Sequence, residues 1–141
     1  HPEMEGMLEV DRCLRLRERH FNVVPFGQTY QLGKLFFIHG TYTNEHHAKA
    51  TAQAYRRCVV YGHTHDMQSY TIVSPMDIED KVMAQSIGCL CNTNPHYMKH
   101  KPNRWQHGFY YAYIRSNGDF TGTVVPIVRG VCTVNGITHR G

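Results

Sequence analysis

Three histidines stand where apolar segments of the chain end, and imidazole is a common metal ligand. His39 directly follows the apolar stretch 34–38, while His63 and His65 belong to the motif Gly62-His63-Thr64-His65, which follows the apolar run Cys58–Tyr61. In an extended segment, residues at positions i and i+2 project to the same side. The spacing therefore predicts that His39, His63 and His65 bind a divalent metal ion. Zinc, manganese, iron and nickel all accept imidazole, and the sequence does not choose among them.

These histidines must be positioned by the elements that precede them. The stretch 34–38 reads as a strand, the alanine-rich run 45–57 as a helix with Thr43 or Asn44 as its N-cap, and 58–61 as a buried strand. In strand-helix-strand units, ligands gather at the carboxyl ends of the strands. All three histidines lie there, which strengthens the prediction of one shared site.

The rest of the chain is predicted to be mostly β-structure. Residues 3–20 are the exception and read as a helix, because apolar positions recur among charged ones and cations gather toward its end. Further strands are expected at 22–26, 29–32, 69–73, 82–89, 108–115, 120–128 and 131–134, with hairpin turns at 116–119 and 135–136 and long loops at 75–81 and 92–106. We therefore expect a single α/β domain over 1–141, with a β-rich C-terminal portion, rather than an all-β barrel.

Composition narrows the class of protein. The chain has 141 residues, of which 41% are hydrophobic, so a disordered tail is excluded. A net charge of +4 is too small to identify a nucleic-acid partner. Five cysteines, an odd count without framework spacing, favour a reducing compartment. No segment has the length of a membrane span or the pattern of a signal peptide, so we predict a soluble cytoplasmic protein.

Other candidate residues have plainer interpretations. His46 and His47 are adjacent, diverge by about 100 degrees on a helix, and are expected in its solvated first turn. Asp66 is expected to support a metal ligand or to lie at the surface. Tyr42 and Asn44 could bind phosphate, but loop polarity and helix capping explain them equally well. Cys58, Cys89 and Cys91 are expected to be buried thiols rather than ligands of a zinc site. Residues 96–107 are expected to form a charged loop anchored by Trp105 rather than a nucleic-acid surface.

A family resemblance covers most of the chain. The stretch Leu32-Gly33-Lys34-Leu35-Phe36-Phe37-Ile38-His39-Gly40, a helix, and then Val59-Val60-Tyr61-Gly62-His63-Thr64-His65 resemble the second half of a calcineurin-like metallophosphoesterase, particularly of the small bacterial and phage members. Residues 86–90 and 103–109 also resemble the end of such proteins. The most specific part is the pairing of His-Gly with Gly-His-x-His.

The resemblance implies a fold and an activity. The fold would be the second half of a four-layer β-sandwich flanked by helices, holding two divalent ions (Mn, Fe, Zn or Ni) that activate water to hydrolyse phosphate mono- or diesters, including nucleotides or nucleic acids. His39 and His63 would bind the second metal and His65 the first. The family's Asp-x-His, Gly-Asp-x-x-Asp and Gly-Asn-His motifs do not occur here. We therefore expect this chain alone to be inactive.

Two further expectations follow from that missing half. Without it an apolar sheet face or edge would be exposed, which favours a homo-oligomer or a strand-exchanged dimer. The alternative to an enzyme is a non-catalytic metal- or nucleic-acid-binding module that uses the histidines and the basic loop.

Overall fold

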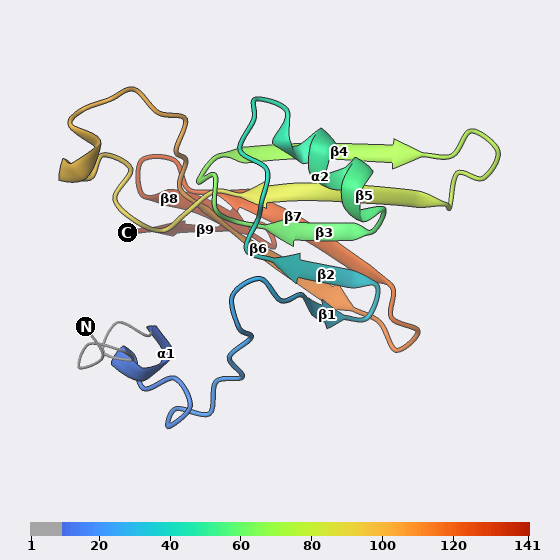
Figure 1. Cartoon of the computed structure of the whole chain (residues 1–141), viewed down its shortest axis with the longest axis horizontal. Coiled ribbons are helices and arrows are strands. Elements are labelled where there is room, and N and C mark those ends of the chain that lie inside the picture. Colours follow the sequence, from blue (N-terminus) through green and yellow to red (C-terminus); the bar gives the residue numbers. More distant parts are fainter. Residues whose placement is uncertain (1–9) are drawn as a thin grey trace.

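The structure is a computed structural model that describes residues 10–141, and it is a β-rich α/β fold (Figure 1). The elements in chain order are α1 (Val10–Cys13), β1 (Tyr30–Leu32), β2 (Leu35–Ile38), α2 (His47–Tyr55), β3 (Cys58–Tyr61), β4 (Met67–Val73), β5 (Lys81–Ile87), the 3₁₀ turn η2 (His96–Met98), β6 (Gly108–Ile114), β7 (Phe120–Pro126), β8 (Val131–Val134) and β9 (Ile137–Arg140). Within this described range, no helix is both long and apolar enough to cross a membrane.

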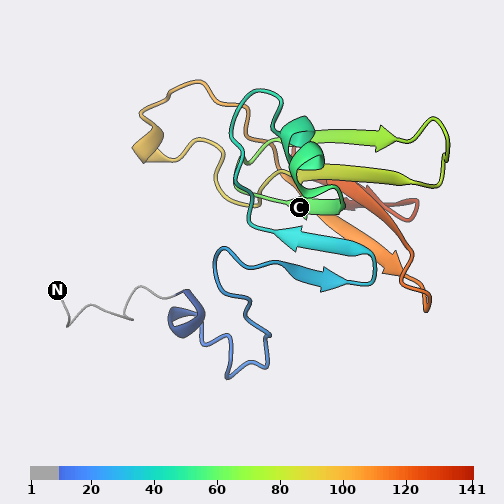
Figure 2. The ribbon, with the colours of Figure 1, turned by 45° about the vertical axis from the view of Figure 1, so that its right-hand side comes forward.

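The centre of the fold is a mixed five-stranded sheet in the order β1-β2-β3-β5-β4. The inner strands β2, β3 and β5 are parallel, and the edge strands β1 and β4 are antiparallel to their neighbours. Helix α2 lies on one face of this sheet, and the β6–β7 hairpin crosses on the other side (Figures 1 and 2). The predicted α/β class and the strand-helix-strand unit β2-α2-β3 are both confirmed.

The core forms where α2 meets the middle of the sheet. Ala52 of α2 packs with Val59 and Tyr61 of β3 and Ala84 of β5, all of them buried. Val60, whose side chain points to the other face, is buried as well. Strand β3 is therefore covered on both faces, as its unbroken apolar run predicts. Each such valine contributes about 1.5–3 kcal/mol by burial.

Helix α2 is two residues shorter at each end than the predicted range 45–57. Its N-cap is His46, which makes no side-chain cap hydrogen bond, so the prediction of Thr43 or Asn44 as the cap is wrong. The backbone N–H of Ala48 donates instead to Oε1 of Gln68, 2.9 Å away on β4. A distant strand thus satisfies one of the free N–H groups of the first turn, which a local pattern cannot reveal.

The N-terminal segment departs most from prediction. Of the predicted helix 3–20, the structure describes α1 followed by turns to residue 20, and residues 1–9 lie outside the described part. Leu14, one of the predicted apolar positions, is exposed, and a helix of this length depends on packing an apolar face for most of its stability. The predicted strand 22–26 is also wrong within the described structure, since Pro25 has no N–H to donate to a sheet ladder.

The C-terminal strands agree closely with prediction. The two predicted hairpins are present as β6–β7 and β8–β9, and Asn135 and Gly136 between the latter both have the positive φ of a tight hairpin turn. One predicted strand, 82–89, ends early at Ile87. Gly88 adopts a φ of +75°, and a Cβ there would lie 2.5 Å from the backbone oxygen of Gln106. The chain therefore leaves the sheet at Gly88 to meet the segment before β6.

The turn between β1 and β2 is joined to the turn between β6 and β7. The backbone N–H of Lys34 donates to the carbonyl of Gly118, and Lys34 Nζ donates to Asp119 Oδ1 at 2.6 Å. Hydrogen bonds from Lys34 and then Asn117 hold the pKa of Asp119 below its ordinary value of 3.8. A lowered carboxyl pKa adds stability that is complete above the unfolded value and is lost as the pH falls through the folded pKa.

We expect Lys34→Met to lower the urea midpoint slightly at neutral pH, with the difference shrinking as the pH falls below 3.8. The effect is small because both side chains are well exposed to solvent. Urea unfolding at a series of pH values measures it, and Lys101→Met in an exposed loop is the matched control. A difference that grew on acidification would contradict the assignment.

Candidate metal centre

His39 and His63 meet at the end of the sheet where the parallel strands β2 and β3 finish. Strands β2 and β3 are parallel, with Ile38 beside Tyr61, so the residues that follow them leave the sheet together. The Nε2 atom of His39 lies 2.9 Å from Nδ1 of His63, and the ring centroids are 4.8 Å apart. Both residues are exposed. The predicted convergence is thus confirmed for this pair.

One glycine and one backbone hydrogen bond support this approach. Gly40 has a φ of +111°, and a Cβ there would lie 3.0 Å from the Cβ of His63. The backbone N–H of Gly62 donates to the carbonyl of His39 at 3.2 Å, which joins the two segments beyond the strands. A side chain at Gly40 would push His63 away, so the glycine after His39 has a direct structural reason.

His65 takes a different direction. His63 and His65 have φ angles of +69° and +61°, so the premise that this segment is extended is wrong. The ring of His65 packs edge-on against Trp105, with centroids 4.3 Å apart, and no hydrogen bond or ring contact joins it to His39 or His63. Residues in the left-handed region cost of order 1–3 kcal/mol and concentrate at functional sites. Trp105, which the sequence predicts to anchor the loop 96–107, thus contacts His65.

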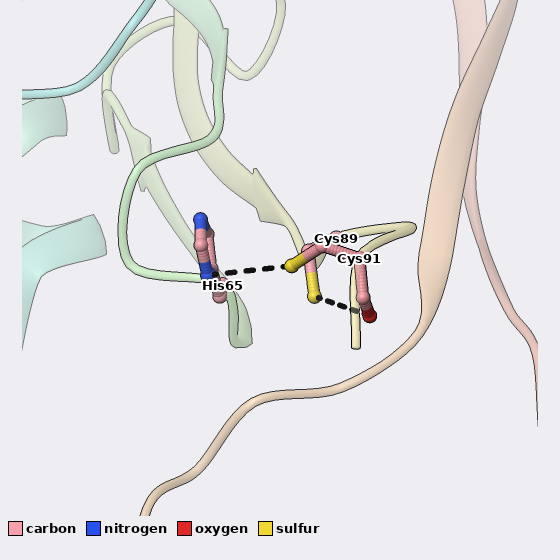
Figure 3. Close-up of side chains that lie close together, drawn as sticks. All are labelled: His65, Cys89 and Cys91. Carbon is pink, nitrogen blue, oxygen red and sulfur yellow. Dashed lines mark hydrogen bonds between the residues drawn. The ribbon is translucent and has the colours of Figure 1, made fainter. Parts of the chain in front are cut away.

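His65 lies instead beside two cysteines that follow β5 (Figure 3). Its Nδ1 is 3.9 Å from Sγ of Cys91, and the ligand atoms of His65, Cys89 and Cys91 all lie within 4.8 Å of one another. We call these three residues the His-Cys-Cys cluster. Among the described residues it is the group of three that could hold a metal ion.

The cysteines differ from the expectation of buried thiols. Cys89 is half-buried and Cys91 is exposed. Burial and then the neighbouring Cys91 raise the pKa of the Cys89 thiol. Cys58 begins β3, at the end of the strand opposite to Gly62, and takes no part in the cluster. In the sequence, the Cys-x-Cys spacing of Cys89 and Cys91 is the signal that points to this cluster. The third member, His65, stands 24 residues before Cys89.

His47 is the clearest correction among the histidines. Only 3% of it is exposed, whereas a solvated first-turn residue was expected. Its Nδ1 lies 2.6 Å from the hydroxyl of Tyr61 and its Nε2 lies 3.0 Å from Oδ2 of Asp66. Helix α2 packs its first turn onto the sheet and thereby carries His47 inward. His46 is exposed, as predicted.

The surroundings of His47 indicate where its proton resides. Burial and then the charge of Asp66 raise the pKa of Tyr61 to about 12, so this phenol keeps its proton beside Nδ1 of His47. Nε2 then carries the proton and donates to the Asp66 carboxylate, which can only accept. Every polar atom of the imidazole is satisfied. Asp66 therefore hydrogen-bonds to a histidine, but that histidine, His47, is not one of the predicted metal ligands.

A cavity of about 470 Å³ opens beside this group. Its lining residues are Thr43, Asn44, Glu45, His47, Thr64, Asp66, Arg104 and Trp105. Arg104 forms an exposed ion pair with Glu45 at 3.3 Å, so the cation of the lining is already partnered. Asn44 lines this cavity, which could hold a small polar molecule, whereas Tyr42 does not line it.

The chain was compared with protein-family models, with curated proteins and with solved structures, and none of them matches it.

Proposed function

We propose that this chain is the metal-binding half of a metal-dependent phosphoesterase in which His39 and His63 hold a divalent cation. The observation that carries the proposal is the 2.9 Å separation of their facing nitrogens. Two imidazole nitrogens bound at about 2.1 Å and at right angles to one ion lie about 3 Å apart. The two nitrogens are hydrogen-bonded to each other here, so their spacing suits one cation, but the rings would rotate about their side-chain bonds to direct both lone pairs at it.

The bound cation would supply the proposed chemistry, and the choice of a phosphate ester as the substrate rests on the family resemblance. A bound divalent ion lowers the pKa of water and stabilises charge on phosphoryl oxygens. His39 and His63 would orient that ion at the open edge of the sheet, where an ester can approach. In this proposal the five-stranded sheet and the β6–β7 hairpin belong to a four-layer sandwich.

The other cation of the two-metal site, the first metal in the family's order, needs ligands beyond this pair. The resemblance assigns His65 to it, together with a bridging carboxylate, because two adjacent dications repel strongly. In the part of the chain that the structure describes, no aspartate or glutamate joins His39 and His63 in a group of three. We propose that the carboxylates come from a segment bearing the Asp-x-His and Gly-Asp-x-x-Asp motifs, which 1–141 does not contain.

The missing carboxylates also favour a second candidate. A non-catalytic metal-binding module would use the same pair of histidines and would need no bridging group. The two functions differ in hydrolysis, and both require that His39 and His63 bind a cation.

The test uses the natural polypeptide that contains residues 1–141, stripped of metal and supplied with Mn²⁺, Fe²⁺, Zn²⁺ or Ni²⁺ in turn. We expect it to bind a cation and to hydrolyse p-nitrophenyl phosphate or its bis ester, and to lose this activity on chelation. Binding without hydrolysis would replace the enzyme with the binding module. Absence of binding at the His39–His63 pair would overturn both.

A further inference from the structure

The His-Cys-Cys cluster is built from three segments that are far apart in the sequence. His65 follows β3, Cys89 and Cys91 follow β5, and Trp105 and Gln106 precede β6. Backbone hydrogen bonds join these segments: Gly88 N–H donates to Asp66, Gln106 N–H donates to His65, and Cys89 N–H donates to Gln106, at 2.8–3.0 Å. The ligand-bearing backbone is therefore held in place by protein contacts alone.

The side chains around the cluster add to this support. Trp105 packs against the ring of His65, and Nε2 of His107 lies 2.8 Å from the carbonyl of Cys91. Gly88 lets the segment before β6 come close, since a Cβ at that position would meet the carbonyl of Gln106. Sites held by such supporting contacts bind their ligands with little reorganisation.

The distances suit a tetrahedral ion. Around zinc, with bonds of about 2.3 Å to sulfur and 2.0–2.1 Å to nitrogen, neighbouring ligand atoms lie about 3.6–3.8 Å apart. His65 Nδ1 and Cys91 Sγ are already 3.9 Å apart, and no ligand pair of the cluster exceeds 4.8 Å. Side-chain rotations that move the ligand atoms by about 1 Å would therefore bring them to the spacing of a zinc site.

We infer that His65, Cys89 and Cys91 bind Zn²⁺ with the fourth coordination position open. Thiolate sulfur prefers zinc to hard cations such as Mn²⁺, and two cysteines with one histidine form a known donor set for zinc with an exchangeable fourth ligand. Each thiol releases its proton to solvent as it binds. This site uses neither His39 nor His63, so its test leaves that pair untouched, but it takes His65, which then cannot serve the other cation of the proposed phosphoesterase.

Cobalt provides a direct test, because Co²⁺ replaces Zn²⁺ and bonds from thiolates to cobalt give a strong near-ultraviolet charge-transfer band. Reduced, metal-free protein titrated with Co²⁺ should develop this band with one ion per chain. Trp105, the single tryptophan, lies against His65, so its fluorescence should be quenched in parallel. Zn²⁺ should then displace the cobalt and abolish the band.

Substitutions locate the ion. Cys91→Ser, which changes an exposed residue, should weaken Co²⁺ binding by at least about 100-fold, since even outer partners of metal ligands are worth 10–100-fold. Cys89→Ser should do the same, and Cys58→Ser and Cys132→Ser are the controls that should keep the band. His63→Ala should keep it as well, which separates this site from the His39–His63 pair.

Circular dichroism of each variant establishes that the fold is retained. A folded, reduced wild-type chain without the charge-transfer band would overturn the inference. So would a band that survives in the Cys89→Ser, Cys91→Ser double variant or one that disappears in Cys58→Ser.

Discussion

Replacing His63 with alanine should lower metal-dependent phosphate-ester hydrolysis by the natural polypeptide by at least about 100-fold while leaving the fold intact. Water activation and charge stabilisation by a bound cation supply several kcal/mol of the reduction in barrier, and these are lost with the ion. The fold should survive because the side chain of His63 is exposed and its ring contact is with the equally exposed ring of His39. His39→Ala should have the same effect.

His46→Ala is the matched control for these variants. It removes an imidazole of equal chemistry from an exposed position that forms no side-chain cap hydrogen bond. We expect normal turnover and normal cation affinity for it, measured by initial rates and by titration calorimetry across a range of Mn²⁺ concentrations. Turnover by His63→Ala that stays near normal at limiting metal would rule out the pair as ligands.

His47→Leu should lower the free energy of unfolding by about 2–4 kcal/mol, although it replaces a polar residue with an apolar one of similar size. The substitution leaves the Tyr61 hydroxyl and the Asp66 carboxylate without their shared partner in a buried site. A buried polar group left unpaired costs about 1–3 kcal/mol, and more when it is charged. Urea unfolding of the wild-type and variant chains measures the difference.

Two comparisons isolate this cause. Tyr61→Phe removes one hydroxyl and should cost less, about 1 kcal/mol, since His47 then loses only one of its two bonds. His46→Leu, at the neighbouring exposed position, should change stability by less than about 0.5 kcal/mol. If His47→Leu were as mild as His46→Leu, the hydrogen-bonded group of Tyr61, His47 and Asp66 would not stabilise the fold.

The sequence by itself determined the elements whose residues carry a strong local pattern. The apolar runs of β2 and β3, the alanine-rich α2 between them and the Asn-Gly turn before β9 each restrict the backbone through nearby residues. Parallel pairing of β2 with β3 then follows from the length of the helical connection, and it brings His39 beside His63. This half of the candidate site was therefore predictable.

The segment 3–20 shows where a local pattern is insufficient. Its charged and apolar residues favour a helix, but in the part that the structure describes no packed face supports one beyond Cys13. Helices of this length gain most of their stability from tertiary packing rather than from intrinsic propensity. The local sequence sets the helix propensity of this segment, whereas the packing that would stabilise a helix depends on the rest of the fold.

Only the tertiary structure decided the surroundings of the remaining histidines. His47 is buried because α2 turns its first residues onto Tyr61 and Asp66, and His65 meets Cys89 and Cys91 because left-handed residues turn its loop toward the end of β5. These contacts join segments separated by 14 to 26 residues. Periodicity and turn signals act over a few residues, so they determine which elements form, whereas side-chain partners across such distances depend on how those elements pack.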